Sequence, residues 1–323
     1  MKSTESKTNL FWKKIKWQIP KTNTNNYHEI NFKNIDTNPT GLVFFFTTII
    51  APLFLSLLNF LIWKDNSSND YILFVQSILT WIIIGVGFYV IQKQIGKDEM
   101  FRNGAMAFYF FYYIPNAVAL IFSLVLSLLG ISEYSTTLLL TFSIIGDLVP
   151  LIMCFVMMPI FKNKMINTLK NDWKIFLIAI TAFIFLTFIL SSLFSEIQHI
   201  ITPNSNSNNQ NDLTDLDSWW DKILLFILTI MVAPFIEEMA TRHGIFALSS
   251  NRWFAFFSSI LFFAGMHITS SNDWTHIIGY LGGSIALTTC FMIARDNVTY
   301  SIFTHMGINL ISYILILAVP GQN

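Results

Sequence analysis

Long apolar runs, each about as long as a bilayer is thick, constrain the fold of this chain more than any other feature. A transmembrane helix needs roughly 20 mostly apolar residues. The strands of a membrane barrel alternate apolar and polar residues, and these runs do not. We therefore expect an all-α, polytopic helical membrane protein with about 8–9 transmembrane helices. The runs cover residues 41–63, 71–91, 106–130, 138–161, 175–194, 220–248, 253–269, 275–294 and 298–319.

The composition agrees with this fold class and excludes several functions. Of the 323 residues, 54% are hydrophobic and 12% are charged, and the net charge is zero. Without an overall basic field, a nucleic acid is not an expected partner, whereas a lipid bilayer is. Cys154 and Cys290 both lie in apolar runs, so neither a disulfide framework nor a cysteine metal site is indicated.

The chain divides into four expected parts. Residues 1–40 form a polar, basic N-terminal arm, which lacks the early apolar core of a cleavable signal peptide. Residues 41–194 hold the N-terminal transmembrane helices, and residues 195–218 form a polar and acidic loop. Residues 219–323 form a C-terminal core of four helices.

The loops alternate in charge. The 195–218 loop has no Lys or Arg, whereas the N-terminal arm and the 92–105 and 162–174 loops are rich in them. Because cytoplasmic loops carry an excess of Lys and Arg, we expect a cytoplasmic N-terminus and an external 195–218 loop. The expected location is the plasma membrane.

Ionisable residues are concentrated inside the C-terminal apolar runs. Such residues are costly in a membrane, usually face the interior of the helix bundle and often carry function. The N-terminal half holds one comparable acid, Asp147. The C-terminal set is Glu237, Glu238, Arg242, His243, His267 and His305, with Asn309 following.

Helix spacing separates the two adjacent glutamates. Glu238 and Arg242 are four residues apart, with the acid first, which favours a structural ion pair. Glu237 lies about 100° around the helix, and no cation stands three or four residues from it. Glu237 is therefore the candidate general base.

Two further spacings place other polar groups near Glu237. Glu237 and His267 each lie fifteen residues from Arg252, so an antiparallel helix pair would bring them level, roughly 22 Å from the turn. His305 and Asn309 are four residues apart and share one helix face. A carboxylate and histidine facing a histidine and asparagine could activate water and stabilise an oxyanion.

These residues match the pattern of a known family. The motifs read Glu237-Glu238-Met239-Ala240-Thr241-Arg242, then Phe263-Ala264-Gly265-Met266-His267, then His305-Met306-Gly307-Ile308-Asn309. The chain thus resembles the CAAX prenyl protease and bacteriocin-processing family, also called the CPBP or Abi family, over roughly residues 218–319. It departs from the family at His243, where glycine often follows the arginine directly.

The resemblance implies an intramembrane endopeptidase of the glutamate type, without a cofactor and with an opening towards the cytosol. Glu237 and His267 would activate water, and His305 and Asn309 would stabilise the oxyanion. Glu238, Arg242 and Phe263 would support the site. The implied substrate is a small peptide or membrane-associated protein, as in bacteriocin or quorum-sensing peptide maturation or in self-immunity.

Other functions stay open at this point. A non-catalytic scaffold of the same fold would bind another membrane protein as its partner. A zinc-dependent membrane protease could use one carboxylate and two histidines as ligands, although an HExxH helix is absent from the sequence. A transporter could place Asp147, between Gly146 and Pro150, in a broken helix. His28, His199, His243 and His276 have no expected role in the site and are expected at the surface or at the membrane interface.

Overall fold

The computed structural model describes residues 39–63, 70–131, 134–203, 216, 218–249, 251–268 and 271–318. The expected N-terminal arm falls almost entirely outside these residues, as does most of the 195–218 loop. Within the described ranges all regular structure is helical. The elements are α2 (Pro39–Phe45), η1 (Phe46–Ile50), α3 (Ala51–Trp63), α4 (Asp70–Ile95), α5 (Lys97–Arg102), α6 (Met106–Leu128), α7 (Thr136–Met157), α8 (Pro159–Asn171), α9 (Trp173–Ile201), α11 (Trp219–Phe226), η2 (Ile227–Val232), α12 (Ala233–Glu238), η3 (Met239–Gly244), α13 (Ile245–Leu248), α14 (Arg252–Met266), η4 (Ser271–His276), α15 (Ile277–Ile293) and α16 (Val298–Ala318).

Eight helical stretches among the described residues are long and apolar enough to cross a membrane. The prediction of an all-α, polytopic membrane protein is confirmed. The ninth apolar run forms α14, which is shorter than the others. The eight spans are Pro39–Ile62, Phe74–Ile95, Met106–Leu128, Thr136–Met157, Trp173–Ile201, Trp219–Leu248, Trp274–Ile293 and Val298–Ala318.

Two helix boundaries differ from the sequence expectation. Helix α9 continues to Ile201, past the expected end at residue 194. Helix α8 occupies most of the stretch expected to be a basic loop, and Pro159 stands in its first turn, where a missing N–H costs nothing. It buries Phe161 and Thr168 while Lys162 stays exposed. Such one-sided burial is typical of a helix lying along a membrane interface.

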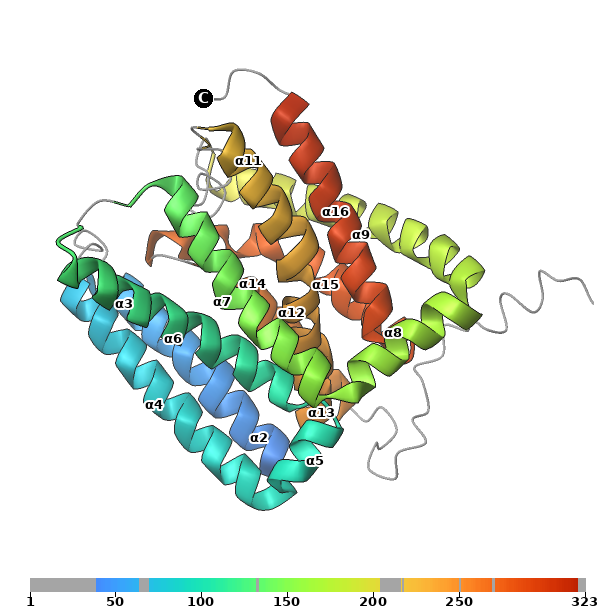
Figure 1. Cartoon of the computed structure of the whole chain (residues 1–323), viewed down its shortest axis with the longest axis horizontal. Helices are drawn as coiled ribbons and strands as arrows, with labels where there is room; N and C mark the ends of the chain where they lie inside the picture. Colours follow the sequence, from blue (N-terminus) through green and yellow to red (C-terminus); the bar gives the residue numbers. More distant parts are fainter. Residues whose placement is uncertain are drawn as a thin grey trace, which may run out of the picture.

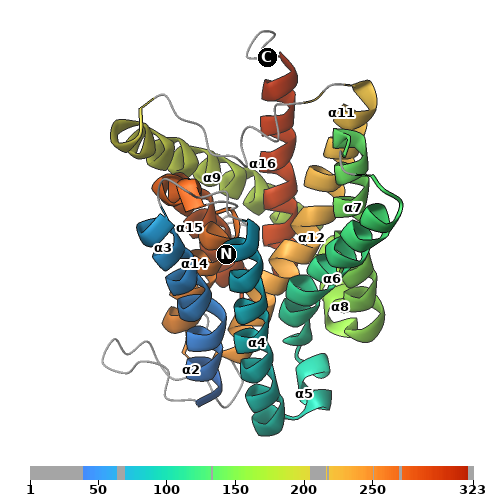
Figure 2. The same ribbon diagram turned by 90° about the vertical axis from the view of Figure 1, so that its left-hand side faces the viewer.

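The span from Trp219 to Leu248 runs through the middle of the bundle as α11, η2, α12, η3 and α13 (Figures 1 and 2). Its central part packs against α6, α7 and α16. Helices α14 and α15 pack together, and α9 lies against both α15 and α16. Helices α2, α3 and α4 form a further group that borders α14 through η1.

The crossing of α9 and α15 depends on a glycine. A Cβ atom added at Gly282 would lie 2.4 Å from the carbonyl oxygen of Leu190. Only a residue without a side chain allows the two backbones to approach so closely, which is how small residues stabilise helix pairs in membranes.

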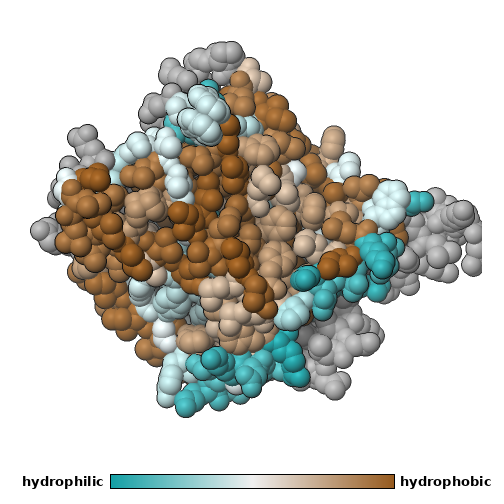
Figure 3. Space-filling view, viewed as in Figure 1, coloured by the Kyte–Doolittle hydropathy of each residue, from teal (hydrophilic) through white to brown (hydrophobic). Residues whose placement is uncertain are grey.

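Polar contacts fasten one end of the bundle. Arg252 forms an ion pair with Asp296, and Nζ of Lys164 donates to the carbonyl oxygen of Asp296 at 2.7 Å. Burial lowers the pKa of the Lys164 ammonium, although the Asp296 carboxylate opposes that shift. The turn between α15 and α16 contains Asp296, and we call it the Asp296 turn. Helix α5, helix α8 and this turn carry cationic groups at the end of the molecule where Figure 3 shows its broadest hydrophilic area.

Candidate active site

The helix that carries Glu237 and Glu238 lies between two π-helical segments, η2 and η3. Such segments often mark functional sites because they redirect side chains. In η2 the backbone N–H of Ala233 bonds the carbonyl of Leu228, five residues back. The next donor in that pattern would be Pro234, which has no N–H. The carbonyl of Thr229 is thus left for another partner.

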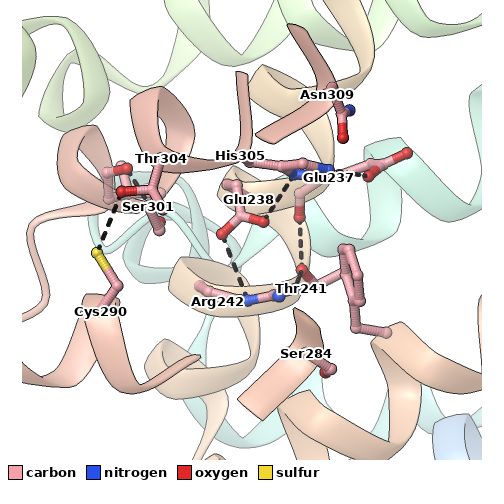
Figure 4. Close-up of polar contacts among 12 residues, drawn as sticks. Glu237, Glu238, Thr241, Arg242, Ser284, Cys290, Ser301, Thr304, His305 and Asn309 are labelled. Atoms are coloured by element: carbon pink, nitrogen blue, oxygen red, sulfur yellow. Dashed lines mark hydrogen bonds and ion pairs between the residues drawn. The ribbon is translucent and has the colours of Figure 1, made fainter. Parts of the chain in front are cut away.

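That partner comes from α16. Nδ2 of Asn309 donates to the carbonyl oxygen of Thr229 at 2.7 Å. The bond fixes the amide of Asn309 against the central span, beside Glu237 and His305 (Figure 4). An amide nitrogen carries two hydrogens, so one N–H of Asn309 is left for another acceptor.

The predicted ion pair between Glu238 and Arg242 is present. Nε of Arg242 lies 3.3 Å from Oε2 of Glu238, and both side chains are fully buried. The guanidinium also stacks over the ring of Phe263, 4.0 Å from its centroid. This places all three residues expected to support the site in one contact group. Breaking such a buried pair would leave an uncompensated charge.

His305 lies between the two glutamates (Figure 4). Its Nδ1 is 3.1 Å from Oε1 of Glu238, and its Nε2 is 3.9 Å from Oε2 of Glu237. A carboxylate at Nδ1 orients the ring and leaves Nε2 facing the reactive side, as in many catalytic and metal-binding histidines. Glu238 is therefore shared between Arg242 and His305, a contact that helix spacing did not predict.

His267 ends helix α14. Its Nδ1 lies 2.7 Å from the carbonyl oxygen of Phe263, one of the terminal carbonyls that have no partner within a helix. A carbonyl only accepts, so Nδ1 carries the proton of the neutral ring and Nε2 is left as an acceptor. The ring stacks on Tyr280 with centroids 4.8 Å apart. The side chain is thus held in one orientation from two directions.

One cavity of about 300 Å³ joins the four residues predicted to be catalytic, Glu237, His267, His305 and Asn309. We call it the site cavity. Glu237 is partly exposed to it, with 16% of its side chain accessible. The histidine within ion-pair distance of Glu237 is His305, and among the described residues no ion pair joins Glu237 to His267. A water molecule between Glu237 and His267 would complete the arrangement expected from the sequence.

Three residues near the site were not assigned by sequence reasoning. Thr229 contributes a carbonyl, and Pro234 five residues later is the signal that could have indicated it. Tyr280 supports His267, and nothing in its sequence context marks it. Asp147, expected only for a transporter, lines the site cavity with Glu237.

The expectation that His243 lies at the surface or interface is wrong, because the residue is buried in the protein interior, away from the site cavity. It is 6% exposed, and its Nε2 lies 2.9 Å from the carbonyl oxygen of Asn103. The ring occupies the space beside Gly104, where a Cβ atom would lie 2.7 Å from it. The departure from the family pattern is therefore accommodated by a glycine on a neighbouring segment.

Comparison with known proteins matches the C-terminal part of the chain to one family. The family model described as "Type II CAAX prenyl endopeptidase Rce1-like" matches residues 218–311, which include all three sequence motifs. A Mycoplasma capricolum protein, described as uncharacterized, is 25% identical over 308 residues and covers 90% of each chain. No solved structure matches.

Two relatives from Lactococcus lactis match shorter parts of the chain. The UPF0177 protein YvdC is 30% identical over 156 residues, which is 46% of this chain and 57% of YvdC. The UPF0177 protein YbdI is 27% identical over 136 residues, which is 42% of this chain and 73% of YbdI. The resemblance expected from the motifs is confirmed.

Proposed function

We propose that this multi-pass membrane protein hydrolyses peptide bonds inside the membrane, and the match of residues 218–311 to the type II CAAX prenyl endopeptidase Rce1-like family supports that proposal. The observation that carries this proposal is the site cavity, in which Glu237, His267, His305 and Asn309 meet. These four side chains come from three separate segments of the chain. The cavity supplies a base, an acceptor and two donors around a space of about 300 Å³.

In the proposed reaction Glu237 removes a proton from a water molecule in the site cavity. Nε2 of His267 accepts a hydrogen bond from the other O–H of that water and so orients it. The oxygen then adds to the carbonyl carbon of the scissile bond, and the carbonyl becomes an oxyanion. When the tetrahedral intermediate collapses, Glu237 gives its proton to the leaving amine.

The oxyanion needs donors at fixed positions. Nε2 of His305 supplies one when it carries a proton, and Glu238 fixes the direction of that ring through Nδ1. The second N–H of Asn309 supplies the other, because its first is committed to Thr229. Arg242 and Phe263 act through Glu238 and take no part in the chemistry.

The proposed membrane orientation follows the charges. Lys97 and Arg102 of α5 lie at the same end of the bundle as α8 and the Asp296 turn. Because cationic segments stay in the cytoplasm, that end and the neighbouring start of α2 are proposed to be cytoplasmic. The proposed substrates remain small peptides or membrane-associated proteins, including peptides for export or immunity. No cofactor is required by this mechanism.

The decisive experiment compares the wild type with Glu237→Gln. Both proteins are purified, reconstituted into liposomes and incubated with a diverse synthetic peptide library, and products are identified by mass spectrometry. We expect the variant to lose at least about a hundredfold in cleavage, because an amide cannot accept the proton from water. Glu196→Gln, an exposed acid on α9, is the matched control and should cleave normally. Cleavage by Glu237→Gln at the wild-type rate would overturn the proposal. A non-catalytic scaffold would form no product in either protein.

A further inference from the structure

A second and larger cavity adjoins the site cavity. It encloses about 500 Å³ between η1, α3, α4, α6 and α14, and Glu237 and Asp147 are part of its wall. We call it the N-terminal cavity because the helices before residue 130 form most of it. Glu237 also lines the site cavity, so the proposed base stands where the two spaces meet.

Two residues in the wall of the N-terminal cavity carry polar atoms without partners. Thr48 is 2% exposed, and its Oγ1 has no hydrogen-bond partner among the described residues. Gln76 is half-buried, and its Oε1 atom is buried and unpaired in the described structure. Both residues line this cavity. Buried polar atoms are costly unless they are hydrogen-bonded, so these two indicate a ligand that carries donors.

Asp147 connects three cavities. It lines the N-terminal cavity, the site cavity and a third space of about 390 Å³ between α6 and α7. No Lys or Arg is among the described residues that line these spaces, and no ion pair there involves Asp147. The described part of the chain thus provides this intramembrane carboxylate with no cation of its own.

We propose that the N-terminal cavity binds the part of the peptide on one side of the scissile bond. In this proposal Asp147 selects a cationic residue, Lys or Arg, in that part of the peptide. The inference rests on the proposed peptidase function and names its substrate class. An extended peptide offers backbone N–H groups to Thr48 and Gln76, and its cationic side chain supplies the partner that Asp147 lacks. Asp147 is a specificity-determining residue in this arrangement.

The polarity of the wall favours a peptide over a lipid tail. An apolar chain would leave the hydroxyl of Thr48, the amide of Gln76 and the carboxylate of Asp147 without partners. Trp274 and Ser56 also meet in this wall, where Nε1 of Trp274 donates to Oγ of Ser56 at 2.8 Å. Binding of a cationic peptide satisfies the polar groups, whereas binding of a hydrocarbon chain buries them unpaired.

The test measures binding, so that it does not depend on cleavage. The Glu237→Gln variant is placed in nanodiscs of uncharged, zwitterionic lipid, and it retains Asp147 as the carboxylate facing the cavity. Two fluorescent peptide libraries are titrated, identical except that fixed positions hold Lys in one and Gln in the other. We expect the Lys library to bind about tenfold more tightly, and Asp147→Asn in the same background to remove that difference. Asp98→Asn, an exposed acid on α5 that lines none of the cavities, is the control and should retain it.

Equal binding of the two libraries to the Asp147-containing protein would overturn the inference, and that comparison requires no change at Asp147. A Lys preference that survives Asp147→Asn would overturn it as well. Tighter binding of a lipidated peptide than of either library would assign the cavity to a lipid tail instead. The proposed function fails separately, by cleavage that persists in Glu237→Gln.

Discussion

Nδ1 of His305 lies 3.1 Å from Oε1 of Glu238, so the carboxylate that neutralises Arg242 also orients a histidine of the proposed active site. The contact links Glu238, the second glutamate of the first motif, on α12, to α16, the helix that carries the third motif. It gives the two adjacent glutamates different surroundings. Glu237 faces the cavity, whereas Glu238 holds the wall of the cavity together.

The two glutamates should therefore differ in their effect on stability. Glu238→Ala would leave the Arg242 guanidinium buried without its carboxylate, and we expect a loss of about 3–5 kcal/mol in the free energy of unfolding. Glu237→Gln should change that free energy by less than about 1 kcal/mol, because Glu237 is partly exposed to the cavity and its ion pair with Nε2 of His305 is long, at 3.9 Å. Denaturant unfolding of both variants in detergent provides the measurement. Similar losses for both would contradict the division of roles.

Asn309 should affect both stability and activity. Asn309→Ala leaves the carbonyl of Thr229 unpaired, which we expect to cost about 1–3 kcal/mol. Loss of an oxyanion donor should also lower kcat by about 10²–10³. Unfolding and cleavage are measured on the same preparation. Ser312→Ala, in the same cavity and exposed, is the control and should change neither by much. Normal kcat in Asn309→Ala would remove this residue from the proposed chemistry.

Local spacing made part of this structure predictable. Eight spans and the contact of Glu238 with Arg242 follow from runs and intervals within single helices. The contact of Glu238 with His305 does not, because it depends on how two helices distant in sequence are turned towards each other. The position of Asp147 beside Glu237 is likewise set by the packing of α7 on the central span. Pro234 is the sequence signal that could have indicated η2.

Cleavage should not depend on a metal ion. Among the described residues no group of three His, Cys, Asp or Glu side chains is arranged to hold one. We expect full activity after dialysis against a strong chelator, and less than about 0.1 equivalents of zinc by elemental analysis. Activity lost to the chelator and restored by added zinc would support the zinc protease instead.

The crossing of α9 and α15 offers a test of the fold that is independent of the chemistry. In Gly282→Ala the new Cβ would lie 2.4 Å from the backbone oxygen of Leu190, which cannot move without displacing α9. We expect a loss of about 1–3 kcal/mol, the usual cost of overpacking. Gly279→Ala, one turn earlier on α15, meets only Gln198 atoms at 3.8 Å or more and should leave stability nearly unchanged. Thermal unfolding of the two variants measures the difference, and equal melting temperatures would show that α9 and α15 are not packed this closely.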